Sequence, residues 1–175
     1  MKLSSIISAS ILAFSSLVNA DSEDFGLIAI RSGSDLQYAG IFSQNGTLYF
    51  GHVGNSSLSG RINDCGQLVL ADNSSVVINN DGSLEESDDL KKATDGFAIQ
   101  DGHLLYKQDN DEFFAVPQAH DSSIYLVSTK RNGNESLSVV IRAQGYSGDV
   151  AHDFHATKNC STSVVGAEME ISSYT

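Results

Sequence analysis

The clearest chemistry in this sequence lies in five short motifs. Each motif has an asparagine, then a residue other than proline, then a serine or threonine, which is the acceptor pattern for N-linked glycan. The five asparagines are Asn45, Asn55, Asn73, Asn134 and Asn159. All but Asn159 fall in expected turns or loops, where an oligosaccharide transferase can reach them. We expect at least two of the five to be used.

Cysteine chemistry is confined to one pair, Cys65 and Cys160. In an oxidising compartment, an even pair is most simply one disulfide. Two free buried thiols and an intermolecular link remain as alternatives. Neither cysteine has a sequence neighbourhood that clearly favours a thiolate, so we do not expect a catalytic cysteine. A disulfide at Cys160 would also compete with glycosylation of Asn159, because Cys160 is the middle residue of that motif.

No residue pattern predicts catalysis, a metal site or a cofactor. His152 and His155 could bring two imidazoles together, but zinc needs three or four ligands and no third is indicated. Two carboxylates would suffice for glycoside hydrolysis. A cleft for saccharides normally stacks sugars on aromatic faces, however, and the sequence has no tryptophan. We therefore expect a non-enzymatic protein.

Residues 1–20 read as a cleaved secretory signal peptide. Lys2 supplies the positive start, and residues 6–18 form an apolar stretch diluted with serine and alanine. The small side chains of Val18 and Ala20 suit a signal peptidase, which predicts cleavage between Ala20 and Asp21. This stretch is too short and serine-rich to be a membrane span, and no later segment could be one. Residues 21–175 then have the length of one domain with its own core.

The chain is strongly acidic, with a formal net charge of −12. Loss of Lys2 with the leader makes the mature chain more negative still. Such a surface repels phosphate backbones, which excludes nucleic acid as a partner. It also argues against binding to anionic membranes and suits a soluble or polysaccharide-embedded protein.

Strand signals dominate the chain, so the expected fold class is all-β. Short apolar runs end at Gly, Asn, Asp or Ser clusters, and Asn45-Gly46 is a strong hairpin signal. Only residues 85–93 favour a helical turn. The expected strands are residues 25–31, 36–43, 47–52, 58–63, 67–71, 75–79, 97–100, 103–107, 112–116, 123–130 and 136–143, with a possible final strand at 163–173.

An internal repeat organises these strands into hairpins. Four segments share an Asn or Asp, then a Gly, and a Leu two residues later, with the glycines at positions 46, 66, 82 and 102. Each Gly permits the positive φ of a tight turn, and each Leu begins an inward-facing return strand. We expect about twelve short antiparallel strands in one compact domain, arranged as a β-trefoil or a β-sandwich.

The segment Asp24–Tyr38 closely resembles the start of mature yeast cell wall mannoproteins of the Cwp type. The similarity continues at residues 45–48, 81–84, 93–99 and 101–106, and more faintly at 147–154. The resemblance implies a glycosylated, non-enzymatic structural component of a fungal cell wall, secreted and in contact with wall β-glucan and other wall proteins. Members of this family usually continue into a Ser/Thr-rich stalk and a GPI signal. Neither is visible here, so we expect the wall-protein domain without that anchor.

A second hypothesis is a carbohydrate-binding, lectin-like module that recognises wall glucan or mannan. Hairpins repeated around a core can present sugar sites on loops. Tyr38, Tyr49, Tyr106 and Tyr125 are the candidate platforms for a sugar ring. The alternative for these tyrosines is packing within the sheets, with their hydroxyls at the rim.

Overall fold

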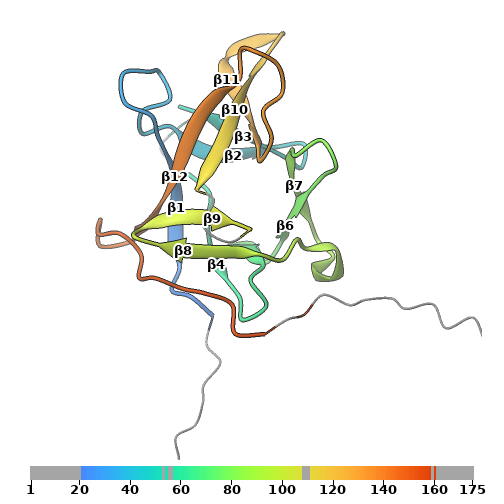
Figure 1. The fold of residues 1–175 in the computed structure, drawn as a ribbon, viewed down its shortest axis with the longest axis vertical. Helices are drawn as coiled ribbons and strands as arrows, with labels where there is room; N and C mark the ends of the chain where they lie inside the picture. Colours follow the sequence, from blue (N-terminus) through green and yellow to red (C-terminus); the bar gives the residue numbers. More distant parts are fainter. Residues whose placement is uncertain (1–20, 53, 55–56, 108–110, 159, 161–175) are drawn as a thin grey trace, which may run out of the picture.

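The computed structural model describes residues 21–52, 54, 57–107, 111–158 and 160. Within these residues the fold is all-β, with twelve antiparallel strands and one short 3-10 helix, η1 (Leu90–Lys92) (Figure 1). The expected fold class and strand number are confirmed. The strands are β1 (Phe25–Ile30), β2 (Gly40–Gln44), β3 (Thr47–Gly51), β4 (Ser59–Ile62), β5 (Leu68–Leu70), β6 (Ser75–Ile78), β7 (Leu84–Ser87), β8 (Phe97–Gln100), β9 (His103–Tyr106), β10 (Glu112–Gln118), β11 (Asp121–Ser128) and β12 (Leu137–Gly145).

Six strands form a ring in the order β1, β4, β5, β8, β9, β12. Adjacent members pair between β1 and β4, β4 and β5, β8 and β9, β9 and β12, and β12 and β1. The contact between β5 and β8 is different. There, the Phe97 N–H donates to the Gly66 carbonyl at 2.9 Å, just before β5 begins. Closing a sheet on itself in this way removes exposed edges.

The other six strands form three hairpins, β2–β3, β6–β7 and β10–β11. The first of these hairpins contacts both others, since β3 pairs with β7 and with β11. A six-strand ring capped by three hairpins is the arrangement of a β-trefoil, so the β-trefoil is the correct one of the two expected architectures.

The four repeated glycines fall into two kinds of turn. Gly46 and Gly82 lie at hairpin tips, whereas Gly66 and Gly102 join successive ring strands.

One hydrophobic core fills the ring and continues under the hairpins. Alternate residues of β1 face it, so Phe25, Leu27 and Ala29 are buried and the residues between them are partly exposed. Phe97 of β8 and Phe113 of β10 are also fully buried. The core therefore links the ring to its cap and fixes the positions of the surface loops.

Three turns between successive strands share an Asp-x-Ser sequence that stabilises the turn locally. Asp72, Asp81 and Asp121 each accept hydrogen bonds from the backbone N–H and the hydroxyl of the serine two residues later. The serine hydroxyl and then its N–H hold the pKa of each of these carboxyls below its ordinary value. Such turns explain why short polar sequences end the strands so sharply.

Several expected element boundaries are wrong. The strand expected at 36–43 begins only at Gly40, because Ser34 caps a turn that buries Leu36 and Ala39. The segment 85–93, expected to favour helix, begins as part of β7, and only Leu90–Lys92 is helical. The strand expected at 123–130 starts and ends two residues earlier, as β11. The possible strand at 163–173 lies outside the described residues.

Candidate functional site

Three of the five acceptor asparagines lie on exposed turns of the described chain. Asn45 occupies the tip of the β2–β3 hairpin, and Asn73 lies in the β5–β6 turn. Both adopt a positive φ, of 53° and 69°. Asn134 is in the loop between β11 and β12. The side chains of all three face solvent, where a glycan would fit. Asn55 and Asn159 lie outside the described residues.

The hydroxyl partners of two of these acceptors are not exposed. Ser75, the third residue of the Asn73 motif, is 1% exposed and donates to the Ser87 carbonyl at 3.1 Å. Ser136, in the Asn134 motif, is 2% exposed and donates to the Asn132 carbonyl. In the folded domain these hydroxyls are out of reach of a transferase, although their asparagines are exposed.

The segment comprising residues 150–158 and Cys160, which we call the strap, runs alongside β8 (Figure 1) and contacts this strand and the β4–β5 turn. On one side Phe154 exchanges two backbone hydrogen bonds with Ile99 of β8, at 2.8 and 2.9 Å. On the other side the N–H groups of Thr157 and Lys158 donate to the Asp64 carbonyl, at 3.1 and 3.0 Å. The strap thus takes the place of direct β5–β8 pairing.

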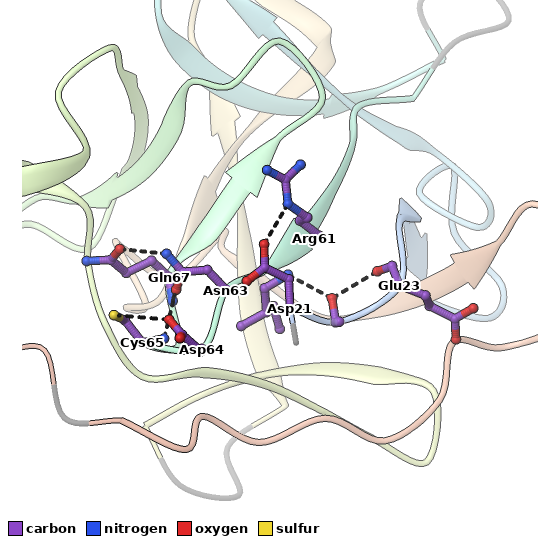
Figure 2. A network of polar contacts seen from close by, with 9 residues as sticks. Asp21, Glu23, Arg61, Asn63, Asp64, Cys65 and Gln67 are labelled. Carbon is purple, nitrogen blue, oxygen red and sulfur yellow. Dashed lines mark hydrogen bonds and ion pairs between the residues drawn. The ribbon is translucent and has the colours of Figure 1, made fainter. Parts of the chain in front are cut away.

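A disulfide joins Cys160 of the strap to Cys65 in the turn before β5, with the two Cα atoms 5.3 Å apart. The Lys158 ammonium pairs with the Asp64 carboxylate beside it. Figure 2 shows that Asp64 also lies close to the Cys65 sulfur. Their 3.5 Å separation is a contact only, because a disulfide sulfur has no proton to donate. The strap is therefore fixed to this turn covalently, by an ion pair and by backbone hydrogen bonds.

The same end of the molecule holds the start of the described chain. Arg61 Nε donates to Asp21 at 2.9 Å, and Glu23 lies nearby (Figure 2). The backbone N–H of His152 donates to Glu23 Oε1 at 2.7 Å, and its Nδ1 lies 2.6 Å from the same oxygen. The backbone hydrogen bond first, and the imidazole second, lower the pKa of Glu23. Residues 21–23 and the strap are thereby linked by polar contacts.

The histidines are distributed over the surface. His52, His120, His152 and His155 are exposed, and His103 is partly exposed, 3.4 Å from Asp111. In the described part of the chain, no cluster of three or more His, Cys, Asp or Glu residues could hold a metal ion. The pair His152 and His155, considered as two possible ligands, gains no third partner among these residues.

The four candidate tyrosines occupy different environments. Tyr38 is 68% exposed, whereas Tyr49 stacks on Phe42, with ring centroids 5.9 Å apart. Tyr106 packs on Phe97, and the ammonium of Lys107 lies 5.2 Å from the Tyr106 ring. Tyr125 packs against the core and lines a pocket of about 310 Å³ beside β3. Of these four tyrosines only Tyr38 is largely exposed, and the other three pack on neighbouring side chains.

Two further grooves lie on the surface. A groove of about 750 Å³ runs between the strap and the β8–β9 hairpin, where Phe97, Leu105, Lys107 and His155 line it. A second groove, of about 400 Å³, lies between the β2–β3 hairpin and the β5–β6 turn, and Phe42, Asp72 and Glu86 line it.

Comparison with known proteins agrees with this topology. A model of the PGA60 trefoil-like domain family matches residues 29–146. The chain belongs to this family. The match runs from near the end of β1 to just past the end of β12, so it covers most of the trefoil-like domain and stops before the strap.

Cell wall protein CWP1 of Saccharomyces cerevisiae is similar to this trefoil-like chain. The two are 44% identical over 154 residues, which is 88% of this chain and 62% of CWP1. The chain thus spans less than two thirds of that relative's length. The resemblance to the Cwp type of yeast wall protein is confirmed, and no solved structure matches the chain.

Two features of the trefoil-like domain were missed from the sequence. The strap shows no strand pattern, because only Phe154 forms a ladder contact with β8. The pocket beside β3 is lined by Asp35, His52 and Tyr125 from three separate parts of the chain, so no local motif contains them.

No helix in the described chain has the length and apolarity needed to cross a membrane.

Proposed function

We propose that this protein is a secreted, glycosylated and non-enzymatic structural component of the fungal cell wall. In this proposal, residues 1–20 are the leader, cleavage follows Ala20, and residues 21–175 are one wall-protein domain. The observation that carries it is the 44% identity with a cell wall protein over 88% of this chain. The domain would contribute charge and glycan to the wall and contact β-glucan and other wall proteins.

Several structural features support a durable extracellular role. Most strand edges of the ring are paired, the strap is fixed by a disulfide, and the described acceptor asparagines lie on exposed turns. The carboxyl groups whose pKa values are lowered owe this to turn and strap hydrogen bonds. Strong displacement of a pKa in a cleft would favour catalysis, whereas these shifts have a structural cause.

The location is tested by fractionating the native host with an antibody against residues 21–160. We expect the protein in washed walls, from which hot detergent or glucanase releases it. Release by detergent would indicate noncovalent retention, and release only by glucanase would indicate a covalent link to glucan. Recovery only from the medium or from intracellular membranes would contradict the proposal. Turnover of any wall glycan by the purified protein would contradict its non-enzymatic part.

Glycosylation is tested at each acceptor by Asn→Gln substitution and intact mass before and after endoglycosidase treatment. Because the hydroxyls of Ser75 and Ser136 are buried, Asn73 and Asn134 must receive glycan before the domain folds. We therefore expect the unglycosylated, refolded protein to be a poor acceptor at both positions in vitro and a good one when unfolded. Equal transfer to folded and unfolded protein would contradict this order of events.

A further inference from the structure

The pocket beside β3 lies where three distant elements meet. They are the β1–β2 connection, the end of β3 and the start of β11. Leu36, which is 1% exposed, and the partly buried Tyr125 form its apolar part. Asp35, His52, Ser122 and Ser123 contribute its polar part, and the volume is about 310 Å³. An apolar surface with a few convergent polar groups is typical of small-ligand sites.

Hydrogen bonds hold these walls in place without a ligand. His52 Nε2 lies 2.8 Å from the Asp35 carbonyl, which ties the end of β3 to the β1–β2 connection. Within that connection the Arg31 N–H donates to Gln37 Oε1 at 2.9 Å. Ser123 is held by Asp121, through its N–H at 2.9 Å and its hydroxyl at 2.5 Å. The pocket is thus preorganised, which lowers the entropy cost of binding.

The polar groups mostly offer acceptors. A backbone carbonyl can only accept, so the proton of the neutral His52 ring must be on Nε2, and Nδ1 remains an acceptor. The Asp35 carboxylate adds two acceptor oxygens, and the Ser122 hydroxyl can both donate and accept. Such a set matches a ligand that carries many hydroxyl donors.

The charge of the pocket lining narrows the class of ligand further. The lining contains Asp35, with Asp121 adjacent through Ser123, and it contains no Lys or Arg. The whole chain has a formal net charge of −12. Phosphorylated or otherwise anionic sugars are repelled by these carboxylates. A neutral sugar can place its hydroxyls on the acceptors and its C–H face against Tyr125.

We propose that this pocket binds a neutral oligosaccharide. Asp35 and His52 accept hydrogen bonds from sugar hydroxyls, and Tyr125 packs against the ring. The inference rests on the proposed wall location only for the supply of ligand, which there is wall polysaccharide. Each carboxylate in the groove at the β5–β6 turn already accepts a hydrogen bond, which uses part of its acceptor capacity. Ser74 bonds Asp72, and Ser43 donates to Glu86 at 2.6 Å.

The test is NMR titration of the ¹⁵N-labelled domain with laminarihexaose, mannohexaose and chitohexaose, which distinguish glucan, mannan and chitin as sources. We expect saturable shifts for at least one of these neutral probes, centred on the amides of Leu36, His52 and Tyr125. Asp35→Ala and His52→Ala should each weaken that binding by more than tenfold, because each removes an acceptor. Mannose 6-phosphate should bind more weakly than mannose.

Asp72→Ala is the matched control, since Asp72 lies between a ring strand (β5) and the first strand of a hairpin (β6), as Asp35 lies between β1 and β2. It should leave the affinity unchanged, and thermal unfolding of each variant confirms that the domain is folded. The proposal would be overturned if none of the three neutral probes changed the NMR spectrum, or if the shifts were centred on another groove. Full affinity in Asp35→Ala would also overturn it. Wall fractionation is independent of this titration, so failure here leaves the proposed location standing.

Discussion

The ring has two seams that are held together in different ways. At the β1–β12 seam, six residue pairs run in register from Phe25↔Gly145 to Ile30↔Val140. At the β5–β8 seam, one backbone hydrogen bond from Phe97 to Gly66 is joined by the strap and its disulfide. The difference indicates that covalent and side-chain links replace strand pairing where the ring is weakest. The seams should therefore respond differently to the same perturbation.

Removing the disulfide should have the largest effect. Cys65 and Cys160 are 95 residues apart in sequence, and the chain-entropy model gives about 4 to 5 kcal/mol for a loop of this length. We expect Cys65→Ser with Cys160→Ser to lower the free energy of unfolding by about this amount in denaturant titration. Native-state hydrogen exchange should also accelerate more at Phe97 and Ile99 of β8 than at the amides of β1.

A variant in the well-paired seam provides the comparison. Ile141 of β12 is fully buried, and Ile141→Ala should cost about 2 to 5 kcal/mol through loss of packing. It should accelerate exchange across the whole ring, since it weakens the shared core. Equal acceleration at both seams in the cysteine variant would show that the strap does not protect the β5–β8 seam in particular.

The next largest effect is expected at Gly66, directly beside the disulfide. Its φ is 76°, and an added Cβ would lie 3.0 Å from Ala156 Cβ of the strap and 3.3 Å from Gly96 N. Gly66→Ala should therefore lower the free energy of unfolding by about 1 to 2 kcal/mol because of the left-handed backbone. Displacement of the strap should lower it further. Thermal and denaturant unfolding measure the total.

Gly33→Ala isolates the backbone part of that cost. Gly33 has a similar φ of 75°, but an added Cβ there meets nothing within 4 Å. We expect Gly66→Ala to be the more damaging of the two, and the excess to shrink when the disulfide is absent and the strap can move. The same cost for both glycines would indicate that the strap is not packed closely on this turn.

Sequence reasoning was most successful where the signal was local. The hairpin at Asn45-Gly46 and the ring turn at Asp101-Gly102 were expected from their turn residues, and both are present. β7 is absent from the expected strands because residues 85–93 read as favouring a helical turn. In the fold Glu86 is partly buried and accepts a hydrogen bond from Ser43, a partner 43 residues away.

Long-range features could not be predicted for the same physical reason. The strap depends on contacts of Phe154 with Ile99 and of Lys158 with Asp64, and the partners in each contact are far apart in the sequence. The pocket at Asp35 likewise exists only after β3 and β11 pair. Local propensity carries no information on such pairings, so the resemblance to a family was the better guide to function than any motif.

A smaller effect is expected from the ion pair at the strap. The Lys158 and Asp64 side chains are 49% and 20% exposed, whereas those of Arg61 and Asp21 are 34% and 39% exposed. Both ion pairs are partly exposed to water, so each should contribute between about 0.2 and 1 kcal/mol to the free energy of unfolding. Because Asp64 is the least exposed of these groups, we expect Lys158→Ala to cost more than Arg61→Ala. Added salt should reduce both differences, and a cost that salt leaves unchanged would contradict an ionic origin.

The smallest effect should be the pH dependence of the contact between Glu23 and His152. The backbone N–H of His152, and then its imidazole, hold the pKa of Glu23 below its ordinary value of 4.5. A carboxyl whose pKa is lower in the folded state stabilises the fold above its unfolded pKa. That contribution is lost as the pH falls through the folded pKa. We therefore expect the strap to loosen in acid, as the pH falls through the folded pKa of Glu23, which lies below its ordinary value.

Glu23→Gln separates this contact from the other acid-sensitive groups. Asp72, Asp81 and Asp121 also have lowered pKa values, so the whole domain should lose stability in acid with the same sign. The glutamine variant keeps an acceptor for the His152 N–H but cannot titrate. Its unfolding midpoint should fall less between about pH 6 and pH 3 than that of the wild type. Hydrogen exchange at Ala151 and Phe154 should show the difference most clearly, because both lie on the strap beside the contact. Parallel pH profiles of the two proteins would show that only the hydrogen bond from the His152 backbone N–H holds the strap at this point. The β5–β8 seam would then depend on the end of the strap that carries the disulfide.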